Sequence, residues 1–271
     1  MEHRQGHLSF QGVRVRYSMS LPSGEISHRI LLLSGAVTTA FNWRKLLPEF
    51  EEMGCLCVCV DLPGCGREVY APGMLPDADR AAGFVWGLLD EIDRATGAGR
   101  ATWHLFAQGA GCRTVLAMHD QYPDSVRSIV NISPVFDAGC VRRLIGHDRA
   151  GWYKKNIASR EGFRKLAERL AGYPLDAFVM DRMRQDLLYP DLPYAVLSTV
   201  KEPALPVHAD FCPCMAIWGG HDELIGTTPQ LLDKYLPGCE PHVMKNAGHF
   251  LTETHSRALR DYLRGWLKYM S

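Results

Sequence analysis

His249 and Asp222 are residues whose types and surroundings could support acid–base chemistry together. His249 lies in Asn246-Ala-Gly-His-Phe near the C-terminus, and Asp222 lies in Trp218-Gly-Gly-His-Asp-Glu. A carboxylate beside an imidazole holds the ring in one tautomer and stabilises the imidazolium that forms when the ring accepts a proton. The pair is therefore a candidate general base and its acid partner. A surface hydrogen bond is the alternative role for His249.

A third candidate position has no side chain. The stretch from His104 to Cys112, HLFAQGAGC, predicts a buried strand, a tight turn of small residues and the start of a helix. Many enzymes present a nucleophile at such a junction, but here the residue at its apex is Gly109. Glycine adopts strained turn angles without steric cost, so we expect the turn to form with its nucleophile position vacant.

The elements that must position these residues alternate between strands and helices. Val13 to Met19 alternates apolar and polar residues, which predicts a half-exposed antiparallel edge strand. Continuously apolar runs instead predict buried parallel strands, and helical segments separate them. The buried strands expected from such runs and their neighbours are Ile30–Leu33, Cys55–Val60, His104–Ala107, Ser128–Ile132 and Met215–Trp218. The pattern predicts an α/β fold with a mostly parallel sheet and helices on both faces.

This alternation is interrupted once. From Phe136 to Pro206 no strand is predicted, whereas Arg160 to Ala171 and Leu175 to Leu187 have helical patterns separated by proline turns. We therefore expect a core domain formed by residues 1–135 and 207–271, and a helical cap inserted as residues 136–206.

Taken in order, these segments resemble the α/β-hydrolase family over nearly the whole chain. Ala107 to Gly111 is similar to its G-x-S-x-G nucleophile elbow, and the Asp222 and His249 segments are similar to its triad acid and base, in the same order. Leu33-Ser-Gly-Ala resembles the oxyanion segment, and Asp61-Leu-Pro-Gly-Cys-Gly resembles the D-x-x-G-x-G loop. The chain differs from the family at three positions, which are Ser34, Ala107 and Gly109.

The resemblance implies roles for the candidate residues. It makes His249 the base, Asp222 the acid and Gly109 the vacant nucleophile position, with an oxyanion hole formed by backbone N–H groups. The residues expected to form the oxyanion hole are Ala36 and Ala110, and those expected to bind substrate are Trp43 and Gln108. Glu223 is an alternative acid. Substitutes for the missing nucleophile are less convincing, and they are Ser34, Cys112 and Asp61.

Composition limits the class of ligand and the cellular compartment that we expect for this protein. Thirty basic and thirty acidic residues cancel, which gives no indication of a nucleic acid or an anionic membrane as partner. No segment reaches the roughly 18 apolar residues of a membrane span, and residues 1–10 do not resemble a secretion signal. We expect a cytoplasmic protein with a small-molecule ligand, no metal and no cofactor. The alternating Cys55, Cys57 and Cys59 are expected to be reduced core thiols.

Three functions are compatible with a triad that lacks its serine. In the first, His249 and Asp222 act on water or a substrate proton in a small ester, lactone or carbonyl compound, by direct hydrolysis, a lyase step or another cofactor-free reaction. In the second, the protein is a catalytically silent ligand-binding or regulatory module, because removing a triad serine costs on the order of a millionfold. In the third, Gly109 was engineered into a serine hydrolase.

Overall fold

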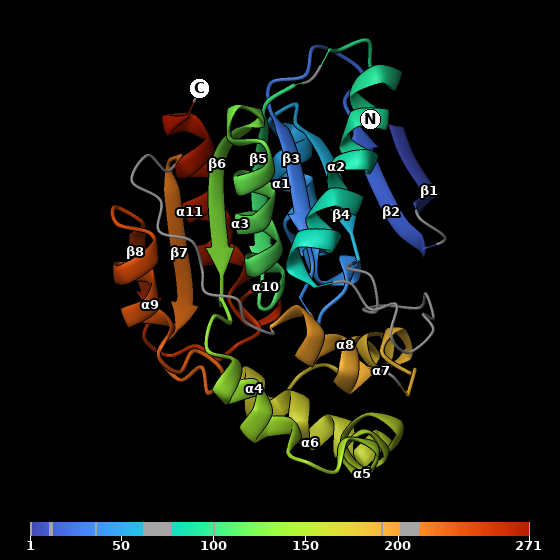
Figure 1. Ribbon diagram of the computed structural model, residues 1–271, viewed down its shortest axis with the longest axis vertical. Coiled ribbons are helices and arrows are strands. Elements are labelled where there is room, and N and C mark those ends of the chain that lie inside the picture. Colours follow the sequence, from blue (N-terminus) through green and yellow to red (C-terminus); the bar gives the residue numbers. More distant parts are fainter. Residues whose placement is uncertain are drawn as a thin grey trace.

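The computed structural model describes residues 2–10, 13–35, 37–61, 77–99, 101–190, 192–200 and 212–270. Its centre is an eight-stranded sheet in the order β1-β2-β4-β3-β5-β6-β7-β8 (Figure 1). The strands are β1 (Glu2–Phe10), β2 (Val13–Leu21), β3 (Arg29–Leu33), β4 (Leu56–Val60), β5 (Trp103–Gln108), β6 (Val126–Ile132), β7 (Cys214–Gly219) and β8 (Glu240–Met244). Strands β4, β3, β5, β6, β7 and β8 run parallel, which confirms the predicted fold class.

The N-terminal end of the sheet differs from the prediction. Strand β2 was expected at the edge, but it pairs antiparallel with β4 on one side and with β1 on the other. Strand β1 was not predicted because Glu2–Phe10 is mostly polar and has no continuous apolar face. A charged strand is suited to a sheet edge, where its side chains discourage pairing with another chain.

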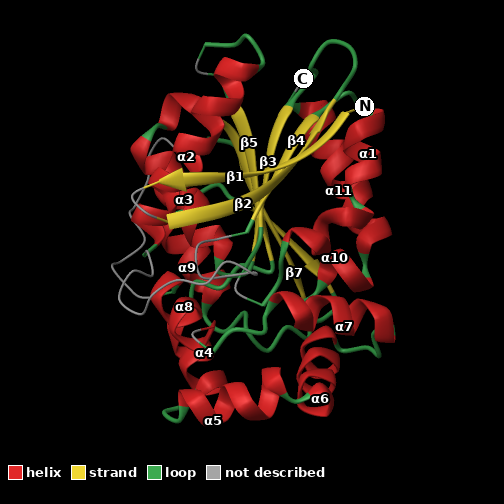
Figure 2. Cartoon of the chain, turned by 90° about the vertical axis from the view of Figure 1, so that its right-hand side faces the viewer, coloured by secondary structure: helices red, strands yellow, loops and turns green. Residues whose placement is uncertain are grey.

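Helices cover both faces of the sheet (Figure 2). Helices α2 and α3 lie on one face, and α1 and α11 lie on the other (Figure 2). These helices are α1 (Leu47–Glu52), α2 (Ala78–Ala95), α3 (Gly111–Gln121), α9 (Thr228–Tyr235), α10 (Leu251–Thr254) and α11 (Ser256–Tyr269), with 3-10 turns η1 (Ala40–Lys45) and η2 (Pro123–Ser125). Strand β3 shows the reason for two layers, because Leu31 and Leu33 join one buried cluster while Ile30 and Leu32 join the other.

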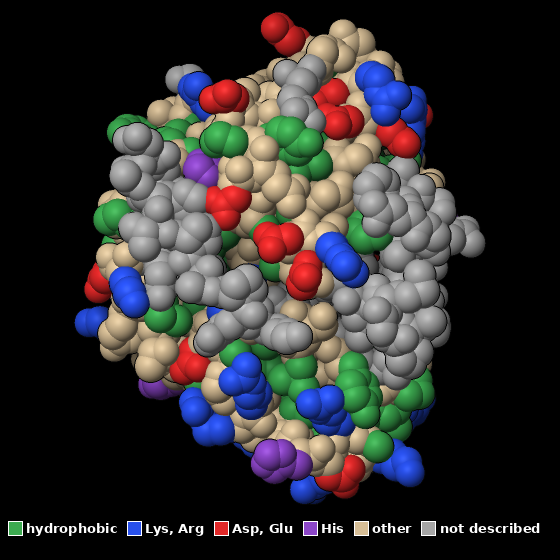
Figure 3. Space-filling model, in the orientation of Figure 1, with side chains coloured by type: hydrophobic (Ala, Val, Ile, Leu, Met, Phe, Trp, Pro, Cys, Tyr) green, Lys and Arg blue, Asp and Glu red, His purple; other side chains and the backbone are tan. Residues whose placement is uncertain are grey.

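A group of helices between β6 and β7, here called the α4–α8 segment, lies beyond the carboxyl ends of the parallel strands (Figure 1). Its members are α4 (Ala138–Ile145), α5 (Arg149–Tyr153), η3 (Lys154–Ala158), α6 (Arg160–Ala171), α7 (Ala177–Asp186) and α8 (Leu192–Thr199). Residues 191 and 201–206 of the predicted cap lie outside the described residues. Lys and Arg side chains are prominent over this segment on the face shown in Figure 3.

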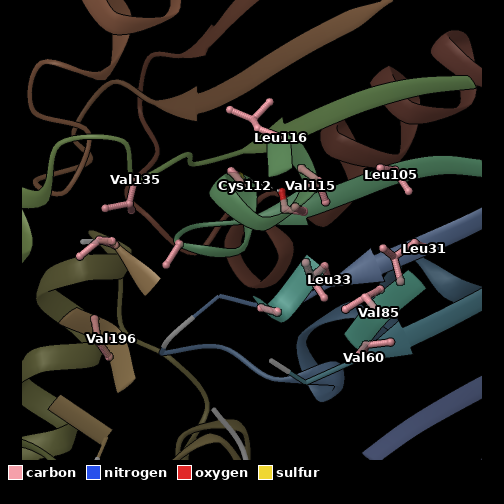
Figure 4. Packing of buried hydrophobic residues seen from close by; sticks show 14 of the residues in the cluster. Leu31, Leu33, Val60, Val85, Leu105, Cys112, Val115, Leu116, Val135 and Val196 are labelled. Carbon is pink, nitrogen blue, oxygen red and sulfur yellow. Dashed lines mark hydrogen bonds between the residues drawn. The ribbon is translucent and has the colours of Figure 1, made fainter. Parts of the chain in front are cut away.

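The apolar core continues from the sheet into this segment. Val135, just after β6, and Val196 of α8 belong to the same buried cluster as Leu33 and Cys112 (Figure 4). The segment is therefore fixed to the sheet by packing as well as by its two chain connections. In the described part of the chain, no helix has the length and apolar character needed to cross a bilayer.

Candidate active site

The turn between β5 and α3 places Gly109 at the carboxyl edge of the sheet. Its backbone has φ +60°, a left-handed conformation that glycine adopts more readily than other residues. The N–H of Gly109 donates to the Ile132 carbonyl at 2.9 Å, and its own carbonyl accepts from the N–H groups of Cys112 at 3.3 Å and Val135 at 3.1 Å. These bonds hold the turn in place although its apex has no side chain.

A side chain at position 109 would point towards His249. An ideal Cβ built on Gly109 lies 3.5 Å from His249 Nε2 and 3.7 Å from Gly35 Cα. Both distances are ordinary van der Waals contacts, so the position has room for a β-carbon. Nε2 of the imidazole therefore faces the side-chain position of residue 109, where glycine has no side chain.

The His249 ring is held by Asp222. Nδ1 of His249 lies 2.9 Å from Oδ2 of Asp222, and the two residues are 2% and 5% exposed. The other carboxylate oxygen accepts the N–H of Leu224 at 2.9 Å. With Nδ1 bound to the carboxylate, Nε2 is the nitrogen available towards Gly109, as a general base requires. The structure thus brings the three predicted residues together, whereas their catalytic roles remain predictions.

Close backbone contacts bring the two loops together. Asp222 follows β7 and His249 follows β8, so both loops emerge at the same edge of the sheet. A Cβ on Gly219, the last residue of β7, would lie 2.2 Å from the carbonyl oxygen of Ala247. Glycine at this position is therefore required for the approach of the two loops.

The α4–α8 segment contacts the histidine loop directly. The N–H of His249 donates to the carbonyl of Leu170 in α6 at 2.6 Å. The hydroxyl of Tyr173, just after α6, donates to the carbonyl of Asn246 at 2.7 Å. The loop that carries the imidazole is consequently bonded to α6 on one side and to the sheet on the other.

One of the two predicted oxyanion donors is described. Ala110 is at the N-cap of α3, where backbone N–H groups are not used by the helix itself. An ideal Cβ on Gly35 would lie 3.3 Å from the Ala110 nitrogen and 2.6 Å from the Gln108 carbonyl, so the two turns touch. Ala36, the other predicted donor, lies outside the described residues. The oxyanion hole therefore remains a prediction.

The two predicted substrate-binding residues are fully buried. Trp43 packs with Leu46 and Phe50 in the core cluster beneath α1 and α11. Gln108 accepts a hydrogen bond from the hydroxyl of Thr252 at 3.3 Å. Substrate contact by either residue stays a prediction, and their surroundings in the described structure are those of the protein interior.

The residues considered as an alternative acid or an alternative nucleophile lie in other surroundings. Glu223 is exposed and lies 3.3 Å from the guanidinium of Arg169 in α6, whereas Asp222 bonds the imidazole. The Cys112 thiol donates to the Ala107 carbonyl at 3.4 Å, and burial raises its pKa, which disfavours the nucleophilic thiolate. Ser34 is fully buried, and no partner for its hydroxyl is found among the described residues.

Asp61 belongs to a separate polar cavity. Its carboxylate accepts the N–H of Ala40 at 2.6 Å and borders a cavity of about 190 Å³ that is also lined by Arg16, Arg182 and Asp186. Burial raises the pKa of Asp61 to about 7, opposed by the Ala40 hydrogen bond and reinforced by the negative charge of Asp186. The hydrogen bond from Ala40 therefore connects the start of η1 to the end of β4. Asp61 also shares its cavity with Arg182 and Asp186 of α7.

Ser133, immediately after β6, was not singled out from the sequence. Its φ of 43° is the one positive value found at a non-glycine residue in the described part of the chain. It is fully buried, its N–H donates to the Ile217 carbonyl at 2.7 Å, and no described residue bonds its hydroxyl. Strain of this kind concentrates at functional sites. The Ser-Pro pair at a strand end was the available sequence signal.

Within the residues that the structure describes, no three His, Cys, Asp or Glu side chains are grouped so that they could hold a metal ion.

Comparisons with known proteins show the family and agree with the observed fold. The sequence model of the Alpha/beta hydrolase family matches residues 30–262. A haloalkane dehalogenase of Mycolicibacterium paratuberculosis (strain ATCC BAA-968 / K-10) is 24% identical over 260 residues, covering 88% of this chain and 82% of the dehalogenase. The epoxide hydrolase CorEH has a similar fold, with a TM-score of 0.81, 15% identity and full coverage of both chains. Est816, an N-acyl homoserine lactone degrading enzyme, has a TM-score of 0.74 and 17% identity, covering 96% of this chain and 99% of its own.

Proposed function

Because the chain belongs to the alpha/beta hydrolase family, we propose that it is a hydrolase in which His249 activates water directly, without a nucleophilic side chain at position 109. One observation carries the proposal. His249 Nε2 faces the side-chain position of Gly109 at 3.5 Å, while Nδ1 is fixed by Asp222 at 2.9 Å. A base oriented towards a position without a side chain is suited to a water molecule or a substrate atom placed there.

The reaction begins with a water molecule beside Gly109. Its oxygen attacks the carbonyl carbon of the substrate as Nε2 of His249 accepts one of its protons. The carbonyl oxygen becomes an oxyanion, which the N–H of Ala110, and that expected of Ala36, would stabilise. Collapse of the intermediate breaks the bond to the leaving oxygen, and His249 returns the proton to it. Asp222 holds the tautomer and stabilises the transient imidazolium.

We propose a small ester or lactone as substrate. The oxyanion hole of the proposal suits a carbonyl group, and the names of the similar proteins include a lactone degrading enzyme beside dehalogenases and epoxide hydrolases. The α4–α8 segment would act as a cap, because it lies over the carboxyl edge and bonds the His249 loop through Leu170. A cap of this kind excludes bulk water from the reacting groups.

The test compares His249→Ala with His255→Ala in an assay against a panel of lactones and aryl esters. His255 is a half-buried histidine close by in the sequence, bonded to Thr254 and not to Asp222. General-base catalysis contributes about 10²- to 10⁴-fold, so His249→Ala should lose that much of kcat/KM while His255→Ala keeps most of it. In oxygen-labelled water, a single turnover should put the label into the product acid and none into the protein.

Three results would reject the proposal. Turnover that survives in His249→Ala would show that the imidazole is not the base. Label in the protein after one turnover would show a covalent intermediate with a protein carboxylate. A protein that binds lactones tightly and turns none over would also reject the proposal, and would instead be a silent ligand-binding module.

A further inference from the structure

Two cysteines lie in contact at the opposite end of β7 and β8 from the candidate site. The Sγ atoms of Cys214 and Cys239 are 3.1 Å apart, which is shorter than the van der Waals contact of two sulfur atoms. Cys214 is the first residue of β7, and Cys239 immediately precedes β8. The two thiols are therefore already placed as partners.

The strand register makes a bond between them geometrically feasible. Met215 pairs with Glu240 in the parallel ladder of β7 and β8, so the preceding residues, Cys214 and Cys239, are opposite each other. Neighbouring strands are about 4.8 Å apart, which lies within the range of about 4.4–6.8 Å for the Cα atoms of a disulfide. Closing the bond needs only a small side-chain movement.

We propose that Cys214 and Cys239 are a site of reversible oxidation and form a disulfide in the presence of hydrogen peroxide. In the first step the Cys239 sulfur attacks one peroxide oxygen, the O–O bond breaks, and a sulfenic acid and one water result. In the second, the Cys214 sulfur attacks the Cys239 sulfur, the S–O bond breaks and a second water leaves. Together the thiols lose two electrons and two protons, and the peroxide is reduced to two waters.

Exposure determines which sulfur reacts first. Cys239 is half-buried, whereas Cys214 is 5% exposed and its sulfur accepts a hydrogen bond from the Asn131 amide at 3.4 Å. A peroxide thus reaches Cys239 more easily, and the Cys214 thiol is held in place to resolve the sulfenic acid. Cys57 and Cys112 are completely buried, so they make useful references for thiols that should not react.

The disulfide would join the two strands that lead to the candidate site. Strand β8 is at the edge of the sheet, pairs with β7, and has mostly exposed or half-buried residues. Asp222 follows β7 and His249 follows β8. A covalent link at the start of both strands would keep the edge strand in register, and this inference does not depend on the proposed hydrolysis.

The experiment treats the folded, reduced protein with hydrogen peroxide and maps its peptides by mass spectrometry without reduction. The Cys214 and Cys239 peptides should appear linked, with the loss of two hydrogens, and dithiothreitol should separate them. The link closes residues 215–238 into a loop, so the oxidised protein should have a Tm higher by roughly 5 °C. Glutathione disulfide is a second oxidant for the same measurement.

Three variants make the result decisive. Cys239→Ser should abolish both the link and the rise in Tm. Cys214→Ser, which removes the buried partner, should have the same effect. Cys212→Ser is the matched control, because Cys212 is a half-buried thiol in the same region and should not be needed. Failure to find the link in folded protein after peroxide treatment, or a link that needs Cys212, would overturn the proposal.

Discussion

Replacing Gly109 by serine gives the most informative perturbation of the candidate site. The new Cβ would lie 3.5 Å from His249 Nε2 without a contact shorter than ordinary van der Waals distance. The hydroxyl one bond further on can then come within about 3 Å of Nε2, the distance of a normal hydrogen bond. The variant would thus contain the nucleophile, base and acid of a serine hydrolase.

The cost in stability and the gain in activity can both be estimated. A serine at φ +60° pays roughly 1–2 kcal/mol for the left-handed conformation, so the Tm should fall by roughly 2–8 °C. Removing the serine from a comparable triad costs about a millionfold, which sets the upper limit of the gain. The surroundings of Gly109 are not adapted to a serine side chain, so only part of this gain is expected. We expect Gly109→Ser to raise p-nitrophenyl acetate hydrolysis by at least ~10²-fold.

The assay is a stopped-flow measurement of p-nitrophenolate with mass spectrometry of the protein. Gly109→Ser should give a burst and an acyl-enzyme, while Gly109→Ala carries the same backbone strain without a hydroxyl and should give neither. Ester hydrolysis in this variant should pass through the acyl-enzyme, because the hydroxyl occupies the proposed water position. A folded Gly109→Ser protein without a burst, or a burst that persists when His249→Ala is added, would refute this account of the site.

Three further outcomes follow from the structure. Replacing Glu253 by alanine should lower the free energy of unfolding by roughly 1–3 kcal/mol, because its side chain is 1% exposed and is paired with Arg44 and Lys45, which are themselves 28% and 39% exposed. A loss below roughly 1 kcal/mol in urea titration would contradict this. The pKa of Asp61 rises from 3.8 to about 7 on folding, so the contribution of Asp61 to stability should decline as the pH rises from about 4 to about 7. The Tm of Asp61→Asn relative to wild type should therefore rise over this pH range, and a constant difference in Tm would contradict this. Gly219→Ala places a Cβ 2.2 Å from the Ala247 carbonyl and should lower Tm and kcat/KM together. Gly265→Ala is the control, because its Cβ meets nothing within 4 Å and should change neither quantity.

The sequence predicted the elements whose patterns are strongest. Helix α6 begins and ends at the predicted residues, because its apolar residues recur on one face and Gly172 follows its last residue. The meeting of Asp222 and His249 was predictable for a different reason, since the ends of neighbouring parallel strands emerge at one edge.

Other features depend on tertiary contacts that a single sequence does not display. Strand β1 exists because β2 offers it a partner, while its own residues are polar. The environment of Trp43 follows from the packing of α1 and α11 onto the sheet, which placed it in the core. The left-handed backbone of Ser133 is set by the junction after β6 and has no periodicity to reveal it.

The bond between His249 and Leu170 has a consequence for how this architecture can change in evolution. Because α6 holds the backbone of the residue that carries the imidazole, the inserted helices are not an interchangeable accessory. A lineage that exchanged them for another insertion would have to replace the Leu170 carbonyl and the Tyr173 hydroxyl with new acceptor and donor groups. Divergence in substrate range is thus expected to accumulate in α4, α5 and α8, while the end of α6 changes slowly.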